Sequence, residues 1–367
     1  MATILHLVAS PFVGGPERQM IGLARALRGT DRSVFLGFPE GGALDERLRA
    51  EGVESHLLAT TGRPLRRAVA EVAEWFGRIA PDVVITHGYK PDLVGLLAAR
   101  RAGIPHVAVS HGWTGATLRV KVNEAVDKLV MRGARRVVAV SHRQGQRVKD
   151  AGIRADRVVV IQNAVDASRF PAPDAATRRE MEALFPVRPE RLVIAAGRLS
   201  PEKGFGDLIQ AARLVVDRMP GVGFLLVGDG PLRGALEAAI REAGLEASFV
   251  LAGFRDDLDR LMASADLFVQ SSHTEGLPNV VLEAGACAVP IVATAVGGTG
   301  EVLEDGRQGR LVPPREPVVL AGAIVEVLSD PAAAKRMGDD ARRRVVAEFT
   351  FAAKAAAYRR MLEDCLS

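Results

Sequence analysis

Short apolar runs recur along the whole chain, separated by longer segments with helical periodicity. Seven fall in the first half and five in the second: ILHLVAS, SVFLGFP, SHLLAT, DVVITHG, HVAVSHG, RVVAVSH and RVVVIQN, then RLVIAAG, GFLLVGDG, FVLAGF, LFVQSSH and PIVATAV. These runs are continuous and rich in β-branched residues, which is typical of parallel strands covered on both faces. Their alternation with helical segments predicts repeated βαβ units, and hence an α/β protein with Rossmann-like, doubly wound parallel sheets.

The length of the chain and one polar segment divide this pattern in two. A chain of 367 residues exceeds the roughly 250 to 300 residues at which single cores stop growing. The weakest stretch between strand runs is the polar, proline-bearing ASRFPAPDAATRREMEALFPVRPE. We expect a first domain over residues 1–166, a linker over 167–190, a second domain over 191–348, and a C-terminal helix over 349–367 that returns to the first domain. Two such sheets would face each other across a cleft lined by the carboxyl ends of their strands.

The composition favours an ordinary water-soluble protein. Hydrophobic residues make up 48% and charged residues 25% of the chain, and no apolar run approaches the roughly 18 residues of a membrane span. The start, MATILHLVAS, has no basic leader and predicts no signal peptide. Cys287 and Cys365 are expected to be reduced thiols rather than a disulfide or a metal site. These features predict a cytoplasmic protein.

Positive charge is concentrated in the first half. Residues 1–165 hold 24 Lys and Arg against 15 Asp and Glu, whereas the remainder holds 24 against 29. Much of the excess comes from Arg63, Arg66, Arg67, Arg100, Arg101, Arg119, Lys121, Lys128, Arg132, Arg135 and Arg136. The pattern fits a solvated helical surface, or a face for an acidic acceptor or for anionic lipid at the inner side of a membrane. Nucleic acid is not expected as a partner, because only 5% of residues are aromatic and few bases could be stacked.

Glycines and cations mark the carboxyl ends of two strands. Gly14 and Gly15 precede a helix in the first domain and would let the backbone approach a phosphate or sugar, although such a turn can equally serve packing. In the second domain, AAGRLSPEKGFG places Arg198 and Lys203 before a helix. Two cations beside glycines at a helix start can neutralise a diphosphate.

Another strand leads into AGFRDDLDRLM. The backbone at Phe254 and Arg255 could form the edge of a site for a planar base. Asp257 and Asp259 would suggest a metal site, but they begin a helix, where capping and the helix dipole explain acids better. We therefore expect no metal.

Two glutamates with seven residues between them stand in TEGLPNVVLEAGACA, which follows the strand run LFVQSSH. Burying an unpaired carboxylate is expensive, so these side chains are expected either to be paired or to face a ligand. Glu275 lies with Gly276 and Leu277 in the exit loop, and Glu283 lies one helical turn further on. Between them the helix begins, and its first turn presents backbone N–H groups near Asn279 and Val280 that can bind an anion.

Carboxylates bind pairs of hydroxyls well. A ligand with a polyol at each end and a diphosphate in the middle would therefore use both glutamates and the anion site between them. A nucleotide sugar has this composition.

In this order the motifs resemble the GT-B glycosyltransferases, specifically the large retaining group with an E-x7-E motif that is often called family 4. The resemblance covers nearly the whole chain. It rests on Gly14-Gly15 with Glu17, His111, SHRQG, QNAVD at 162–166, GRLSPEKG at 197–204, GDGP at 228–231, EGLPNVVLE at 275–283 and GGTGE at 297–301.

The resemblance implies a GT-B fold with an acceptor-binding first domain and a nucleotide-sugar-binding second domain. It implies that Arg198 and Lys203 hold the diphosphate, that Glu283 takes the ribose hydroxyls and that Glu275 contacts the donor sugar. No metal or other cofactor is implied, and the diphosphate's own oxygen would help to draw the acceptor proton. The donor is expected to carry UDP, and the acceptor to be a glycan or lipid-linked molecule of envelope polysaccharide or glycolipid synthesis.

The histidine of the family's His-Asp pair corresponds to His111, but here Gly112 follows it. We expect His111 to orient the transferred sugar or stabilise charge, and SHGWTG to contact the acceptor. A histidine at a strand end is also a common structural residue, and His87 in ITHG has a similar context.

Three alternatives stay open: transfer to a small soluble acceptor, a sugar-nucleotide epimerase or hydrolase, and a non-catalytic sugar-nucleotide-binding protein. The combination of GRLSPEKG with E-x7-E favours transfer. A nicotinamide dehydrogenase is not expected, because no strand is followed by the full glycine fingerprint.

Overall fold

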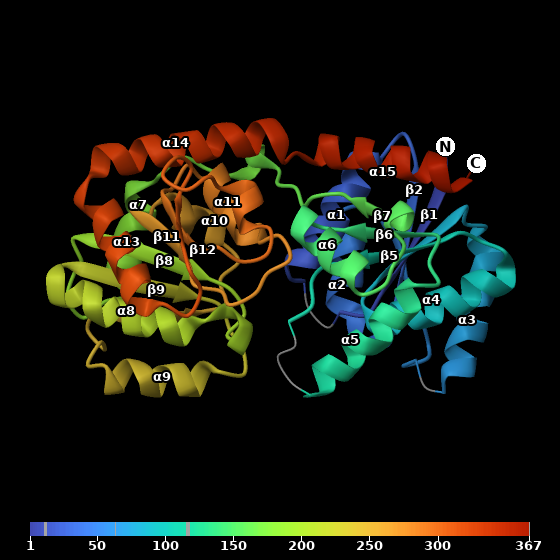
Figure 1. Ribbon diagram of the computed structural model, residues 1–367, viewed down its shortest axis with the longest axis horizontal. Helices are drawn as coiled ribbons and strands as arrows, with labels where there is room; N and C mark the ends of the chain where they lie inside the picture. Colours follow the sequence, from blue (N-terminus) through green and yellow to red (C-terminus); the bar gives the residue numbers. More distant parts are fainter. Residues whose placement is uncertain (11–12, 63, 115–117, 367) are drawn as a thin grey trace. The chain divides into compact units, whose positions relative to one another are not determined.

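The protein is described by a computed structural model that covers residues 1–10, 13–62, 64–114 and 118–366. The chain forms two compact units (Figure 1). The first comprises Met1–Ala164 together with Phe351–Ser367, and the second comprises Val165–Thr350. Each is an α/β unit built on its own parallel sheet, as the sequence predicts.

The sheet of the first unit has seven parallel strands in the order β3-β2-β1-β4-β5-β6-β7. They are β1 (Thr3–Val8), β2 (Arg32–Gly37), β3 (Glu54–Leu57), β4 (Val83–His87), β5 (His106–Ser110), β6 (Arg136–Ala139) and β7 (Val158–Val160). Each coincides with one of the apolar runs of the first half. The strand order reverses between β1 and β4, so the carboxyl ends of these two strands form the switch point where such sheets bind ligands.

Helices cover both faces of this sheet. They are α1 (Gly15–Leu27), α2 (Gly42–Ala50), α3 (Leu65–Ile79), α4 (Tyr89–Ala102), α5 (Leu118–Met131), α6 (His142–Asp150) and α15 (Phe351–Leu366), with short 3₁₀ turns at Pro39–Gly41 and Ala155–Arg157. Leu5 and Leu7 of β1 pack with α3 and α4, whereas Val8 packs with α1 and α2. Alternate residues of one strand therefore face two apolar layers, which explains why the run is almost continuously apolar, with His6 as a polar residue within it.

The second unit has six parallel strands in the order β10-β9-β8-β11-β12-β13. They are β8 (Arg191–Ala196), β9 (Val222–Val227), β10 (Phe249–Gly253), β11 (Leu267–Gln270), β12 (Ile291–Thr294) and β13 (Arg310–Val312). The apolar runs predict the first five strands but not β13, which has three residues, lies at the sheet edge and is followed by two prolines. The switch point of this sheet lies between β8 and β11.

The helices of the second unit are α7 (Ala175–Glu182), α8 (Phe205–Arg218), α9 (Arg233–Glu242), α10 (Leu258–Ala263), α11 (Asn279–Ala286), α12 (Thr299–Val302), α13 (Pro317–Ser329) and α14 (Pro331–Glu348), with 3₁₀ turns at Ala167–Arg169 and Pro201–Lys203. One large apolar core joins strands β8, β9, β11 and β12 to α8, α9 and α13. Helix α14 packs on α11, the helix that carries Glu283.

Residues 167–190, for which the sequence predicts a linker, lie within the second unit and contain α7. Thr177 and Met181 are fully buried there. Arg178 pairs with Glu182 at 2.8 Å and with Asp266 at 2.7 Å. The segment is polar because ion pairs hold it in place, so its composition resembles that of a linker although it is packed.

Helix α15 lies in the first unit and packs on α1 (Figure 1). The ring of Phe351 occupies the space where a Cβ at Gly22 would stand. Lys354 is 7% exposed and donates to Oε1 of Gln19 at 2.7 Å. The last helix therefore contributes a buried amine to the unit that begins the chain.

No single helix in the described part of the chain is long and apolar enough to cross a membrane; α13 and α14, bent by 102° at their junction, meet that test only as a pair. Cys287 and Cys365 are free and buried, which agrees with the prediction of reduced thiols.

Candidate active site

The loop after β11 holds Glu275 in an ion pair. The Glu275 side chain is 11% exposed, and its Oε1 accepts from Nζ of Lys203 at 2.7 Å. The same oxygen accepts from Oγ of Ser272 at 2.7 Å and from Nε2 of Gln270 at 3.5 Å. Two predicted site residues that are far apart in the sequence are thus in direct contact. The carboxylate that the sequence predicts to be paired or aimed at a ligand is paired with Lys203.

Glycines let the backbone close around this pair. Gly297 has φ of 52°, and a Cβ there would overlap the carbonyl group of Glu275. The N–H of Gly298 donates to the carbonyl of Gly276 at 2.7 Å. The backbone of the GGTGE motif therefore packs against the Glu275 loop and hydrogen-bonds to it.

A second glycine, Gly204, lets the Lys203 turn approach the residues that follow β11. Gly204 has φ of 62°, and a Cβ there would overlap the carbonyl oxygen of Ser271. The Oγ of Ser271 donates to the carbonyl of Lys203 at 3.0 Å. The Lys203 turn is therefore held against the end of β11, which fixes the lysine beside Glu275.

His273 adds a contact between the loop after β11 and helix α8 that the sequence does not predict. Its Nε2 lies 2.8 Å from Oδ2 of Asp207 in the first turn of α8, and its backbone N–H donates to the carbonyl of Glu202 at 2.8 Å. The residue is visible in the sequence as the histidine of SSHTEG. Its partner lies 66 positions away, so the contact has no local signal.

Helix α11 begins immediately after this loop. Pro278 stands at its N-cap position, and Asn279 and Val280 form its first turn. The first N–H groups of a helix have no acceptor within the helix and carry its positive dipole end. Leu277 is buried, whereas Glu283 is half-buried one turn further on. The helix start is where sequence analysis predicts an anion site.

The Arg198 loop crosses the loop after β9 at very short range. A Cβ at Gly228 would overlap the carbonyl of Gly197, and one at Gly230 would meet the backbone of Leu199. The GDGP turn is therefore a place of close backbone approach. Arg198 itself is exposed, so its guanidinium is accessible to a ligand.

The residues after β10 are less enclosed. Phe254 is 64% exposed. Arg255 binds both carboxylate oxygens of Asp257, at 2.8 and 2.7 Å, and this hydrogen-bonded guanidinium lowers the pKa of Asp257. Asp257 is the N-cap residue of α10 and Asp259 lies in its first turn, as the sequence predicts, but the Asp257 side chain makes no capping hydrogen bond and binds Arg255 instead.

In the first unit, α1 begins at Gly15 with Gly14 as its N-cap residue. The N–H of Gly14 donates to Oε2 of Glu17 at 2.9 Å. Glu17 is buried, so its carboxylate fixes the entry of the helix. Residues 11–12, which precede this turn, lie outside the described residues, as do Arg63 and the end of the SHGWTG stretch.

Three histidines from neighbouring strands form a stacked row at the switch point of the first sheet. Nδ1 of His6 (β1) lies 3.2 Å from Nε2 of His87 (β4), and Nδ1 of His87 lies 3.2 Å from Nε2 of His111, which follows β5. Successive ring centroids are 5.5 Å apart. His87 and His111, which the sequence presents as competing candidates, are therefore direct neighbours.

Burial keeps this row of imidazoles neutral at pH 7. It lowers the pKa of His6 to about 3 and, with the charge of Lys354, that of His111 to about 4. Burial, followed by the proximity of His111, His6 and Lys354, lowers the pKa of His87 as well. Burial also lowers the pKa of Lys354 to about 7. A neutral His111 can orient a hydroxyl by hydrogen bonding, but it does not supply positive charge.

Lys354 and His6 are members of this group that sequence analysis misses. Lys354 is the lone charge in FAAKAAAY, a pattern that marks a cation on an otherwise apolar helix face. His6 stands inside the apolar run of β1 and stacks on Phe35 with ring centroids 4.5 Å apart. The sequence signal for His6 is that it is a polar residue inside an otherwise apolar run.

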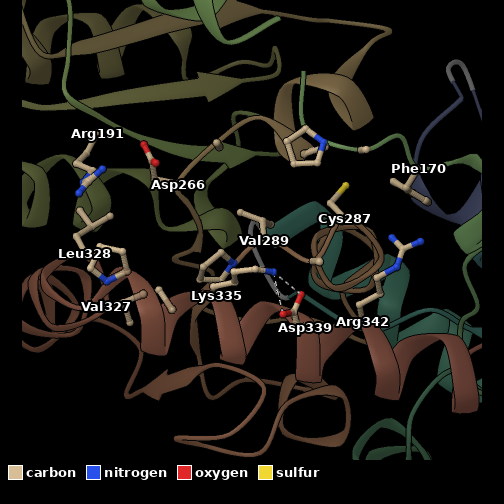
Figure 2. A pocket seen from close by; sticks show the side chains of 18 of the residues that line it. Phe170, Arg191, Asp266, Cys287, Val289, Val327, Leu328, Lys335, Asp339 and Arg342 are labelled. Atoms are coloured by element: carbon tan, nitrogen blue, oxygen red, sulfur yellow. Dashed lines mark hydrogen bonds and ion pairs between the residues drawn. The ribbon is translucent and has the colours of Figure 1, made fainter. Parts of the chain in front are cut away.

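A separate cavity of about 530 Å³ lies in the second unit, near the amino ends of β8, β11 and β12 (Figure 2). Arg191, Asp266 and Cys287 line it, with Lys335 paired to Asp339 (Figure 2). Burial, followed by the charge of Glu283, raises the pKa of the Cys287 thiol to about 12. None of the predicted site residues lines this cavity. It lies at the opposite edge of the sheet from the Lys203–Glu275 pair, so it is not the donor site that the sequence predicts.

Within the described ranges, no three His, Cys, Asp or Glu side chains gather as a metal site requires.

Two family models match consecutive parts of the chain. Residues 13–169 match glycosyltransferase family 4, and residues 177–344 match glycosyl transferases group 1. Together they span most of both units.

Similar proteins with known names agree with this assignment. The chain is 30% identical over 288 residues to glycogen synthase of Mycobacterium tuberculosis, covering 76% of this chain and 67% of that protein. It is 31% identical over 314 residues to the GDP-mannose-dependent alpha-(1-6)-phosphatidylinositol monomannoside mannosyltransferase of the same organism, covering 81% and 78%.

Among solved structures, Anabaena Alr3699/HepE in complex with UDP and glucose matches with a TM-score of 0.89 and 26% identity, over 99% of this chain and 100% of that one. The two parallel sheets, the order of the motifs and these matches agree. The chain belongs to glycosyltransferase family 4 and has the GT-B fold of enzymes that use nucleotide-sugar donors.

Proposed function

We propose that this protein is a retaining, metal-independent glycosyltransferase that moves a sugar from a UDP-linked donor to a glycan or lipid-linked acceptor in envelope polysaccharide or glycolipid synthesis. The observation that carries the proposal is the Lys203–Glu275 pair, held by glycine-shaped loops beside the start of α11. It joins a cation suited to a diphosphate to a carboxylate suited to sugar hydroxyls.

The proposed phosphate site consists of Lys203, Arg198 and the N-terminus of α11. Charge develops on the diphosphate as the sugar leaves, and fixed donors aimed at developing charge are a major source of catalysis. Arg198 offers a fork of N–H groups and Lys203 a compact point charge. These groups would stabilise the leaving group without a metal.

The proposed sugar and ribose sites use the two glutamates. Glu275 would accept from the donor sugar's hydroxyls, and Glu283, further along α11, from the ribose. The backbone at Gly276, Phe254 and Arg255 would complete the walls for the donor. HepE bound to UDP and glucose supports UDP as the nucleotide, whereas the GDP-mannose-dependent relative makes GDP the alternative for an experiment to exclude.

The acceptor side is assigned to the first unit, with Gly14 and Gly15 near the switch point. His111 is neutral because burial holds its pKa at about 4, so its proposed role is to orient a hydroxyl. In the retaining mechanism proposed, an oxygen of the departing diphosphate takes the acceptor proton, and no protein nucleophile is required.

Helix α5 supports an acceptor at a membrane surface. Leu118, Val122 and Leu129 are 79%, 55% and 66% exposed, and their spacing along the helix places them on one side of it. Lys121 and Lys128 stand between them in the sequence. An apolar stripe with cations beside it is the composition of a helix that lies on anionic lipid. We therefore propose peripheral contact with the inner face of a membrane through α5.

A panel of donors tests the function. Thermal shift with UDP-, GDP-, ADP- and dTDP-sugars should raise the melting temperature with UDP-sugars, because a ligand present at 100 times its Kd stabilises by about 2.7 kcal/mol. Turnover of the stabilising donor should persist in EDTA, and NMR should show an α-configured product from an α-linked donor. Stabilisation only by GDP-sugars, an inverted product or loss of turnover in EDTA would each overturn the corresponding part of the proposal.

Vesicle co-sedimentation tests the membrane contact. Binding should require anionic lipid, weaken with salt, and fall in Leu129→Ser relative to the control Val318→Ser, which changes an equally exposed valine (62%) in the second unit. Equal binding to neutral vesicles, or none to anionic ones, would remove the membrane from the proposal.

A further inference from the structure

A cavity of about 450 Å³ opens at the amino ends of β5, β6 and β7 in the first unit. Five arginines line it: Arg100, Arg135, Arg136, Arg154 and Arg157. It lies at the opposite edge of the sheet from His111, because β5 runs from the cavity wall at His106 to the residue before His111. Five residues at about 3.3 Å each separate the two by roughly 16 Å.

One acid from the described part of the chain lines this cavity, and it already pairs with an arginine of the lining. Asp156 binds Arg154 through two hydrogen bonds, at 3.0 and 2.8 Å. Arg157 donates to the carbonyls of residues 132 and 134, and Arg136 donates to the carbonyl of residue 135. Among the described residues, no carboxylate pairs with Arg100, Arg135, Arg136 or Arg157.

Helix ends compensate part of this charge. Helices α4 and α5 end at Ala102 and Met131, close in sequence to Arg100 and to the carbonyls that Arg157 binds. Each helix C-terminus carries about half a negative charge, so together they offset about one of the four unpaired guanidinium groups. A surplus of about three positive charges stays in a concave site, where it repels itself and attracts anions.

The cavity wall also contains an unsatisfied polar atom. His106 is 3% exposed and lines the cavity. Its Nε2 lies 2.8 Å from Oγ1 of Thr86, whereas its Nδ1 has no hydrogen-bond partner in the part of the chain that the structure describes. A buried polar atom without a partner favours an additional polar ligand, or a water that such a ligand orders.

We propose that this arginine pocket binds a phosphate ester or diphosphate, at a site separate from that of the nucleotide sugar. Guanidinium groups bind phosphate oxygens in a two-point fork, and three surplus charges match a diphosphate more closely than a carboxylate. The volume falls within the range of small-molecule sites, which leaves room for an organic group beyond the phosphate. The phosphate belongs either to a soluble molecule or to a phospholipid headgroup.

Calorimetric titration with pyrophosphate tests the pocket, performed in Lys203→Ala so that the proposed donor site contributes less. Arg135→Gln should weaken the Kd about ten-fold, which is about 1.4 kcal/mol. Arg101→Gln removes the same charge from the next residue along from Arg100, outside the pocket lining, and should change the Kd less than two-fold. Arg135 makes no side-chain hydrogen bond within the described ranges, so the melting temperature should stay constant and show that the variant folds.

Vesicles of phosphatidylcholine with and without phosphatidic acid distinguish the two sources. Binding of pyrophosphate in solution that is lost in Arg135→Gln supports a soluble phosphate ligand. Binding of phosphatidic acid vesicles alone, with the same dependence on Arg135 and not on Arg101, supports a headgroup. Absence of binding to both probes, or equal losses in Arg135→Gln and Arg101→Gln, would overturn the pocket as a site.

Discussion

Replacing Glu275 by glutamine should strengthen the binding of free UDP while impairing turnover. Nζ of Lys203 donates to Oε1 of Glu275 at 2.7 Å. A diphosphate that recruits Lys203 must therefore compete with this carboxylate. Glu275→Gln keeps the shape of the side chain and a neutral acceptor, but it removes the competing charge.

The size of the gain follows from the exposure of the pair. Two unit charges at this distance attract by about 6 kcal/mol at an effective dielectric constant of about 20, but desolvation cancels most of that. Hydrogen bonds to charged groups contribute about 1.5 to 3 kcal/mol net, and the 23% exposure of Lys203 favours the lower end. A neutral acceptor retains about 0.5 kcal/mol, so about 1 kcal/mol is released. UDP should bind about five-fold more tightly.

Isothermal titration calorimetry with UDP measures this change, and steady-state kinetics with the full donor measures kcat. Glu202→Gln is the matched control, because it removes a carboxylate next to Lys203 whose Oε1 accepts from Ser200 at 2.6 Å rather than from the lysine. Its UDP affinity should change less than two-fold. The double variant Lys203→Ala/Glu275→Gln should bind UDP no better than Lys203→Ala alone.

Weaker UDP binding in Glu275→Gln would refute the competition, because it would mean that Glu275 holds Lys203 in its binding position instead of withdrawing it. Equal gains in UDP affinity in Glu202→Gln and Glu275→Gln would show that the effect comes from a general loss of negative charge near the site. A kcat within two-fold of the unmodified enzyme would refute the assignment of Glu275 to the transferred sugar, for which a loss of about ten-fold or more is expected.

Three further predictions concern the rest of the site. Glu283→Gln should raise the KM of the donor and weaken UDP binding about ten-fold with kcat nearly unchanged, because ribose contacts are equal in the ground and transition states; calorimetry and kinetics together would expose a kcat effect. Gly297→Ala should lower both the melting temperature and kcat, since its Cβ would overlap the Glu275 carbonyl, whereas a Cβ at Gly300 meets no atom within 4 Å and Gly300→Ala should do neither. The pKa of His6 is about 3 in the folded protein against about 6.5 when unfolded, so between these values the unfolded chain binds a proton that the folded chain does not. The free energy of unfolding, measured in urea, should therefore fall by about 2 kcal/mol per such imidazole as the pH falls from 6.5 to 5. A profile that does not change with pH would contradict this.

The sequence predicts the sheets well because burial on both faces leaves a strong local signal. Every apolar run of the first half became a strand, and so did all five in the second half. The missed strand β13 contains only two apolar residues, Leu311 and Val312, between Arg310 and Pro313, which is too few to form such a run. The linker prediction for residues 167–190 took polar composition as evidence of an exposed segment. It failed because Arg178 pairs with Asp266 within the second unit.

Residue types in the site could be read from the sequence, but their partners could not. Lys203 and Glu275 are separated by 72 positions, and only the placement of β8 beside β11 brings their loops together. The three histidines likewise meet because β1, β4 and β5 are neighbours in the sheet. Strand order is a property of the whole chain, and the motifs around each residue do not contain it.

The pairing of Lys203 with Glu275 has a consequence for how the proposed enzyme distinguishes its donor from its product. A free nucleoside diphosphate can draw Lys203 away, but it leaves a carboxylate that is 11% exposed with Ser272 and Gln270 as its protein partners. An intact donor brings sugar hydroxyls to that carboxylate and so replaces the hydrogen bond that Lys203 gave up. The whole molecule therefore binds without the penalty that its nucleotide half incurs alone. Once the sugar has moved to the acceptor, the pair can re-form at the expense of the diphosphate, which favours release of the product.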